Sequence, residues 1–247
     1  MTVVMRPRVP LRCVQATAAA TTARFRLWTD PPESDYQGAL DFRGRAAEFE
    51  GTRRASGRVL QTVSLPDATF LREPGDRGWM RLHSSRRRQG SRDPFGVLDV
   101  VAALPELVPL EPEPTQRGTL QPHAGRLSAA VLARLADDAS TVTRRVRPLA
   151  PAADDGDAEI SVWLDSRLRI QRVRYGTSRP RAAQLHFELF DFGRPVAVRI
   201  PERFESVDLD VVRGALHREQ TFASESDGSL YTRRGRPSGR RRRCGVE

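Results

Sequence analysis

The sequence predicts an α+β fold in which a curved antiparallel β-sheet, a half-barrel, wraps around a few helices. Two observations indicate this fold. Short runs of alternating apolar and polar residues fall into two blocks, and a block of helical periodicity separates these blocks instead of alternating with them. The apolar positions of the strands would form one face of a long sheet, and those of the helices would form stripes that the sheet can cover.

The first block of strands begins at Ala23. Phe25 and Leu27 alternate with Arg24 and Arg26, which is the period-two pattern of a strand with one buried face. Gly, Pro and Asp residues between the runs are typical of tight turns. Such short connections predict an antiparallel meander over the segments 23–30, 36–42, 45–51, 58–66, 68–74 and 77–82.

Two helices are predicted after this meander. Asp93 can cap the first helix with Pro94 at its first position, and Pro105 ends it. A second helix is predicted over 125–138, after a stiff proline-rich connector at 109–116. The apolar stripes consist of Val97, Leu98, Val101 and Leu104 in the first helix and of Leu127, Val131, Leu132 and Leu135 in the second.

Four further strands are predicted over 158–165, 167–176, 182–193 and 195–200, and from Val211 the hydrophobic pattern fades. We therefore expect three parts. Residues 1–22 form an N-terminal segment with one helix, residues 23–210 form a single half-barrel domain, and residues 211–247 form a mostly disordered Arg-rich tail.

The net charge of +10 is concentrated at the C-terminus. Residues 230–247 hold seven arginines and one glutamate, a net of +6, which leaves +4 on the rest of the chain. The tail can bind an anionic surface, but it lacks the aromatic platforms that suit exposed bases, so nucleic acid is not the favoured partner. Its arginines are Arg233, Arg234, Arg236, Arg240, Arg241, Arg242 and Arg243. Arg86, Arg87 and Arg88 form a second basic site, interpreted as a solvated loop or, alternatively, as a contact for an anionic partner.

The residue types and their spacing favour no enzyme class, and we expect no cofactor and no metal. The chain has no lysine, which excludes a Walker-A or kinase lysine and a Schiff base. The four histidines lie far apart, without the spacing of metal ligands, and Cys13 and Cys244 do not form a CxxC unit. The tripeptide at 191–193 matches the kinase DFG motif, but we interpret it as a turn.

The sequence as given shows no signal for export. It has no apolar run long enough to cross a bilayer and no secretory signal after Met1, which predicts a cytoplasmic protein unless a signal lies upstream of this start.

The order of elements and several short motifs resemble the bacterial lipoprotein-carrier superfamily, over roughly residues 15–208. This superfamily comprises LolA-like carriers and actinobacterial lipid-binding lipoproteins of the LprG and LppX type. The motifs are Gly78-Trp79 at a strand start, Asp93-Pro94 at a helix start and the hairpin segment Trp163 to Asp165. Family members are exported and many are acylated at an N-terminal cysteine, whereas Cys13 falls within the family's first helix.

The resemblance implies a half-barrel with an apolar cavity that holds acyl chains. It implies a non-enzymatic carrier of the bacterial envelope whose partner is a lipid or an acylated ligand, and we expect a monomer. The cavity lining is assigned to Phe25, Leu27, Leu40, Phe42, Phe49, Val63, Leu65, Phe70, Met80, Leu82, Val97, Val101 and Leu104. The same positions would also serve a filled core. Two alternatives therefore remain: a structural, sensor or interaction protein of the same fold, and a nucleic-acid-binding protein that uses the basic tail.

Overall fold

The computed structural model describes residues 8–32, 34–53, 57–83, 94–115, 118–128, 130, 157–177 and 184–208. The chain divides into two units, Met1–Val207 and Asp208–Glu247, and the described residues up to 207 belong to the first unit. Three expectations lie outside the described residues: the disordered Arg-rich tail at 211–247, the basic loop at 86–88 and the greater part of the second helix.

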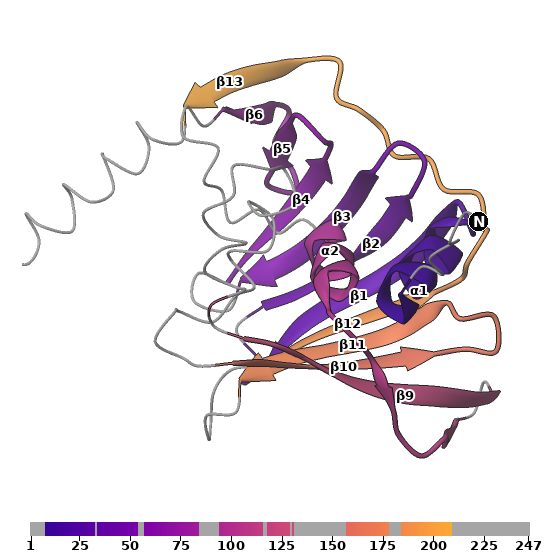
Figure 1. Ribbon diagram of the computed structural model, residues 1–247. Helices are drawn as coiled ribbons and strands as arrows, with labels where there is room; N and C mark the ends of the chain where they lie inside the picture. The colour runs from indigo at the N-terminus through magenta and orange to yellow at the C-terminus, as the bar shows by residue number, and fades with distance from the viewer. Residues whose placement is uncertain are drawn as a thin grey trace, which may run out of the picture. The chain divides into compact units, whose positions relative to one another are not determined.

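One large sheet dominates the first unit (Figure 1). Its strands are β1 (Thr22–Asp30), β2 (Ser34–Asp41), β3 (Ala46–Arg53), β4 (Arg58–Ser64), β5 (Thr69–Arg72), β6 (Trp79–His83), β7 (Val108–Pro109), β8 (Glu113–Thr115), β9 (Gly118–Leu127), β10 (Ala158–Leu164), β11 (Ile170–Thr177), β12 (Gln184–Phe190) and β13 (Phe204–Asp208). They follow the order β13-β6-β5-β4-β3-β2-β1-β12-β11-β10-β9-β7, and β8 pairs with β9 beside this path. The predicted α+β half-barrel is confirmed.

Two helices lie against the same face of the curved sheet, which is its concave face (Figure 1). Helix α1 spans Val9–Ala18 and helix α2 spans Phe95–Ala103. Every residue of α2 from Phe95 to Val101 is buried, because this helix packs beside α1 and its side chains join the core cluster of the sheet. The helix begins one residue later than predicted, because Pro94 is its N-cap rather than its first helical residue and no side chain caps it. The predicted cap, Asp93, lies outside the described residues.

The strand register assigns each side chain to a face, because residues directly opposite each other in antiparallel strands point to the same side. Phe25 lies opposite Gly38, Gly38 opposite Phe49, and Phe49 opposite Thr62. The same row continues through Leu71 to Met80. This row and every second row beside it face the helices, while the intervening rows form the convex face.

The predicted second helix is wrong at its N-terminal end, because Gly125 to Leu127 belong to strand β9. Gly118, Pro122 and Gly125 hide this strand in the sequence, since glycine and proline are rare inside strands. Tertiary pairing decides the conformation: β9 pairs with β10 over seven residues, from Leu127 opposite Ala158 to Gln121 opposite Leu164. The connector predicted at 109–116 contributes the short strands β7 and β8 to the other edge of β9.

The predicted strand over 195–200 is also wrong, because this segment is irregular in the structure and β13 follows it at Phe204–Asp208. The alternation of Val196, Val198 and Ile200 suggested a strand. The N–H of Arg199, however, donates to the Glu48 carboxylate at 3.0 Å rather than to a neighbouring strand. We call residues 194–203 the strap, because they cross the convex face of the sheet on the way to β13.

Candidate ligand-binding face

An aromatic cluster forms the centre of the concave face. Phe25 contacts Phe49 edge to face with ring centroids 5.7 Å apart, and it contacts Phe187 of β12 at 5.9 Å. Tyr36 meets Phe49 at 6.0 Å, again edge to face. These rings are at most 5% exposed. The interlocked edge-to-face geometry is favourable for aromatic pairs and holds four strands against one another.

Two glycines make room for the aromatic cluster. A Cβ on Gly38 would lie 2.2 Å from the carbonyl oxygen of Glu48 and 2.4 Å from the Cβ of Phe49. On Gly51, a Cβ would lie 2.0 Å from the ring of Tyr36. The rings of Phe49 and Tyr36 therefore lie against strand backbone that has no side chain of its own.

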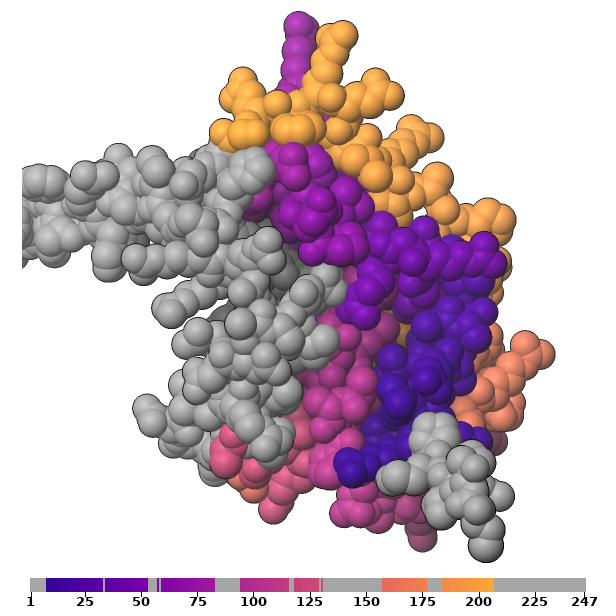
Figure 2. All heavy atoms as spheres, turned by 45° about the horizontal axis from the view of Figure 1, so that its top comes forward, coloured from indigo at the N-terminus to yellow at the C-terminus, as the bar shows by residue number. Residues whose placement is uncertain are grey.

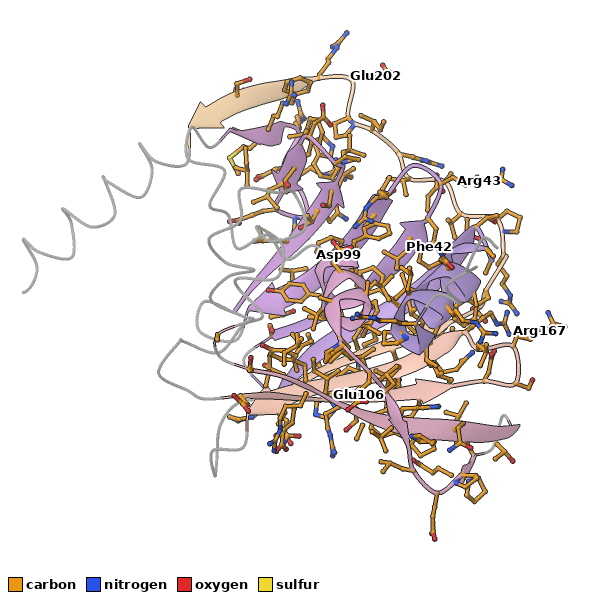
Figure 3. The ribbon with its side chains drawn as sticks, viewed as in Figure 1. Phe42, Arg43, Asp99, Glu106, Arg167 and Glu202 are labelled. Atoms are coloured by element: carbon orange, nitrogen blue, oxygen red, sulfur yellow. The ribbon has the colours of Figure 1, made fainter. Side chains whose placement is uncertain are left out.

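Helix α2 closes this centre and carries one buried acidic residue. The guanidinium of Arg45 donates to both carboxylate oxygens of Asp99, at 3.0 and 2.9 Å, and lies 5.1 Å from the centre of the Phe95 ring. Phe95 in turn packs edge to face on Phe42 at 6.1 Å. Figure 3 labels Asp99 on α2 and Phe42 directly after the end of β2. The ion pair compensates the buried charge and orients the apolar helix on the sheet.

Helix α1 anchors the other side of the core through Thr17. Its hydroxyl donates to the carbonyl of Cys13 at 2.7 Å and accepts the N–H of Ile170 at 2.9 Å. Cys13 is 1% exposed, and burial raises the pKa of its thiol to about 11 although nearby backbone hydrogen bonds lower it. Cys13 is therefore a buried free thiol on the side of α1 that packs against the core.

We expect Cys13 to resist thiol reagents in the folded protein. A buried thiol with a raised pKa has almost no thiolate at neutral pH, and thiolate is the reactive form. In a Cys244→Ser variant, reaction with a chromogenic disulfide reagent should appear only when urea unfolds the chain. Rapid modification of the folded variant would contradict this placement of Cys13.

The structure brings together eight of the residues predicted to line a cavity. All eight belong to the main core cluster and are at most 9% exposed. They are Phe25, Leu27, Leu40, Phe42, Phe49, Val97, Val101 and Leu104.

Three further predicted residues lie on the convex face, which corrects their assignment. Val63 pairs with Glu48 on one side and with Phe70 on the other. Val63 and Phe70 therefore point to the face of the sheet opposite to that of Phe49. Val63 and Phe70 form a second cluster, and Leu65 packs against it. The alternation of Val63 and Leu65 indicated a buried face correctly, but it could not indicate which face. The strap decides this, because its Val198 covers the cluster.

The remaining predicted residues, Met80 and Leu82, do lie on the concave face, since Met80 pairs with Leu71 and Leu82 with Thr69. Met80 is 37% exposed, and Leu60, Leu71 and Leu82 are partly exposed. Between them, Thr62 and Ser64 are buried polar residues on the same face. The concave face of β4 to β6 is therefore a wall of mixed, partly accessible apolar side chains beside the closed core.

Several concave-face residues were not among the predicted set although their strands were. Phe187 and Leu189 on β12 and Ile160 and Val162 on β10 are at most 2% exposed and complete the core. Their alternation with polar residues in the sequence indicated that they would be buried. Tyr175 on β11 is also buried, and burial raises the pKa of its phenol.

The described part of the chain holds no group of three His, Cys, Asp or Glu side chains that could ligate a metal ion. The tripeptide Asp191 to Gly193 lies in the turn after β12. No described helix is long and apolar enough to span a membrane.

Comparison with solved structures identifies the fold. LprF from Mycobacterium bovis superposes with a TM-score of 0.53 at 12% identity, covering 78% of this chain and 95% of LprF. The lipoprotein LppX from Mycobacterium tuberculosis superposes with a TM-score of 0.52 at 14% identity, covering 77% of this chain and 98% of LppX. No protein-family model and no curated protein matches the sequence. The predicted resemblance is confirmed at the level of the fold: the chain has the fold of LprF and LppX.

Proposed function

We propose that this protein is a non-enzymatic binding protein for lipids or lipoprotein acyl chains in the bacterial envelope. The observation that supports the proposal is the concave wall of β4 to β6, where Leu60, Leu71, Met80 and Leu82 are apolar and only partly covered. The fold shared with LppX, itself a lipoprotein, favours the same assignment.

Binding at this wall would require no bond chemistry. An acyl chain laid along Leu71, Met80 and Leu82 would remove apolar surface from water, which is worth roughly 25 cal/mol per Å² before ordering costs. The adjoining aromatic cluster is already packed and buried, so we expect little further ordering of the protein on binding. A flexible methionine at the most exposed position suits ligands of varying shape.

Substituting Met80→Asp should weaken lipid uptake at least tenfold, because an ionised carboxylate on the concave wall would have to be desolvated beside the acyl chain. Val59→Asp is a matched control, since Val59 is 39% exposed against 37% for Met80 but lies on the convex face, on β4 of the same sheet. The measurement is displacement of a fluorescent fatty acid from the purified full chain.

Equal losses in the Met80→Asp and Val59→Asp proteins would refute the concave wall as the site. Native mass spectrometry supplies a second measurement. The wild-type protein should carry bound lipid after purification, and the Met80→Asp protein should carry less. A wild-type protein that neither carries lipid nor takes up the fatty acid would contradict the proposed function itself.

The second candidate function is that of a structural, sensor or interaction protein with a filled core. One observation favours it: the eight predicted lining residues around Phe25 and Val101 form a close-packed core in the structure. The two functions differ in lipid uptake itself. A filled-core protein of this kind would take up no lipid, and overpacking by Val101→Phe would lower only its stability.

A further inference from the structure

A second hollow lies on the convex face, on the opposite side of the sheet from the proposed lipid wall. It has a volume of about 580 Å³ and lies between strands β1 to β4 and the strap residues Pro195 to Ala197. Ligand sites typically measure roughly 300–1,000 Å³. The volume alone does not make a site. The strap residues 195–197 cover the hollow and are called its roof below, and the convex-face side chains of the strands are called its floor.

The roof is held at both ends. At the near end, the N–H of Gly193 donates to the carbonyl of Thr22 at 2.9 Å, and the Thr22 hydroxyl donates to the carbonyl of Arg194 at 2.7 Å. At the far end, Arg199 is tied to Glu48 and Val198 packs into the convex cluster. Figure 2 shows the orange atoms of the strap and β13 beside the purple atoms of β4 to β6. Residues 195–197 therefore bridge the sheet as a fixed span.

The floor is made of two neighbouring rows of convex-face side chains. In the first row, Ala39 lies between Arg24 on β1 and Glu48 on β3. Because alanine is short, it leaves a gap between Arg24 and Glu48, whose backbone positions are two strand spacings, about 10 Å, apart. In the second row, Gln37 lies beside Glu50. The hollow exists because a small residue occupies the centre of a row of large ones.

The polar groups of the floor are largely unused. Among the described residues, the side chains of Arg24, Gln37 and Glu50 form no hydrogen bond or ion pair with any other group. Glu48 accepts one hydrogen bond from the strap and retains further acceptor capacity. Phe190 on β12 lies opposite Arg24 and adds an aromatic face at the edge of the hollow.

We propose that this hollow binds a neutral saccharide. Arg24 offers donors only and the two carboxylates offer acceptors only, while the Gln37 amide offers both. A purely anionic ligand would be repelled by Glu48 and Glu50, and a purely cationic one by Arg24. Sugar hydroxyls donate and accept, so they can satisfy both sides of the gap at once, and the apolar face of a sugar ring can pack on Phe190.

The test uses the full chain, fluorescently labelled, on an array of neutral and acidic glycans, followed by titration of the best neutral glycan in solution. Wild-type protein should bind neutral glycans in preference to acidic ones. Ala39→Leu fills the gap between Arg24 and Glu48 and should weaken the titrated affinity at least tenfold. Thr52→Leu is the matched control. It also introduces a leucine on the convex face, but on β3 and outside the hollow, and it should leave the affinity unchanged.

Three outcomes would overturn the proposal: no binding to any neutral glycan, a preference for acidic glycans, or equal losses in the Ala39→Leu and Thr52→Leu proteins. Glu50→Gln guards against misfolding as the cause of a loss, because it keeps the side-chain shape and removes only the charge. It should weaken neutral-glycan binding while the thermal unfolding midpoint stays within the wild-type range. Lipid uptake at the concave wall should not respond to these variants, so failure here leaves the proposed function standing.

Discussion

Replacing Phe25 by alanine should reduce the free energy of unfolding by about 3–5 kcal/mol, the cost expected for removing a buried aromatic ring and leaving a cavity. Phe25 is 1% exposed and touches both Phe49 and Phe187, so it joins β1 to β3 and to β12 across the concave face. The measurement is equilibrium unfolding in urea, followed by circular dichroism.

Phe204→Ala is the control for this substitution. Phe204 also makes an edge-to-face contact, at 5.2 Å to Phe70, but it lies on β13 and is 39% exposed. Its loss should cost about 1 kcal/mol, as is usual for substitutions away from a core. If the two variants were destabilised equally, the aromatic cluster would not be the centre of the core.

Replacing Gly38 by alanine should destabilise the protein by about 1–3 kcal/mol, although it adds only one methyl group. The new Cβ would lie 2.2 Å from a backbone carbonyl oxygen of β3, which cannot rotate away as a side chain could. Strands β2 and β3 would have to separate, and the ring of Phe49 would lose its place over the glycine. The urea midpoint should fall with little change in the slope of the transition.

Gly78→Ala tests whether the effect depends on position. Gly78 stands in the turn before β6, and a Cβ there would meet nothing within 4 Å. Its substitution should change stability by less than about 0.5 kcal/mol. A large loss at Gly78, or none at Gly38, would contradict the close approach of β2 and β3.

Local patterns predicted most of the elements because each element has its own period. The alternation around Phe25 and Leu27 predicted β1, and the spacing of Val97, Val101 and Leu104 predicted α2. Strand β9 was missed because Pro122 and Gly125 break the pattern, and only pairing with β10 makes these residues part of a strand. The strap was taken for a strand because its alternation is genuine, although it packs on side chains and forms no ladder.

The predicted ligand face was harder to assign, since alternation separates two faces without saying which one is concave. Val63 and Phe70 were placed with Phe25 because all three are apolar. In the structure they lie on opposite sides of the sheet, since both faces of β4 and β5 are partly covered: one by the concave core and the other by Val198 and Phe204.

The sequence by itself determined the class of fold, the order of its main strands, the helix α2 and the apolar rows that form the core. These features depend on contacts between neighbours in the chain, which leave a period that can be read. Tertiary structure alone decided the register of β3 against β4, the pairing of β9 and the path of the strap. Those depend on contacts between residues far apart in the chain, and they place both the concave wall and the hollow on the convex face.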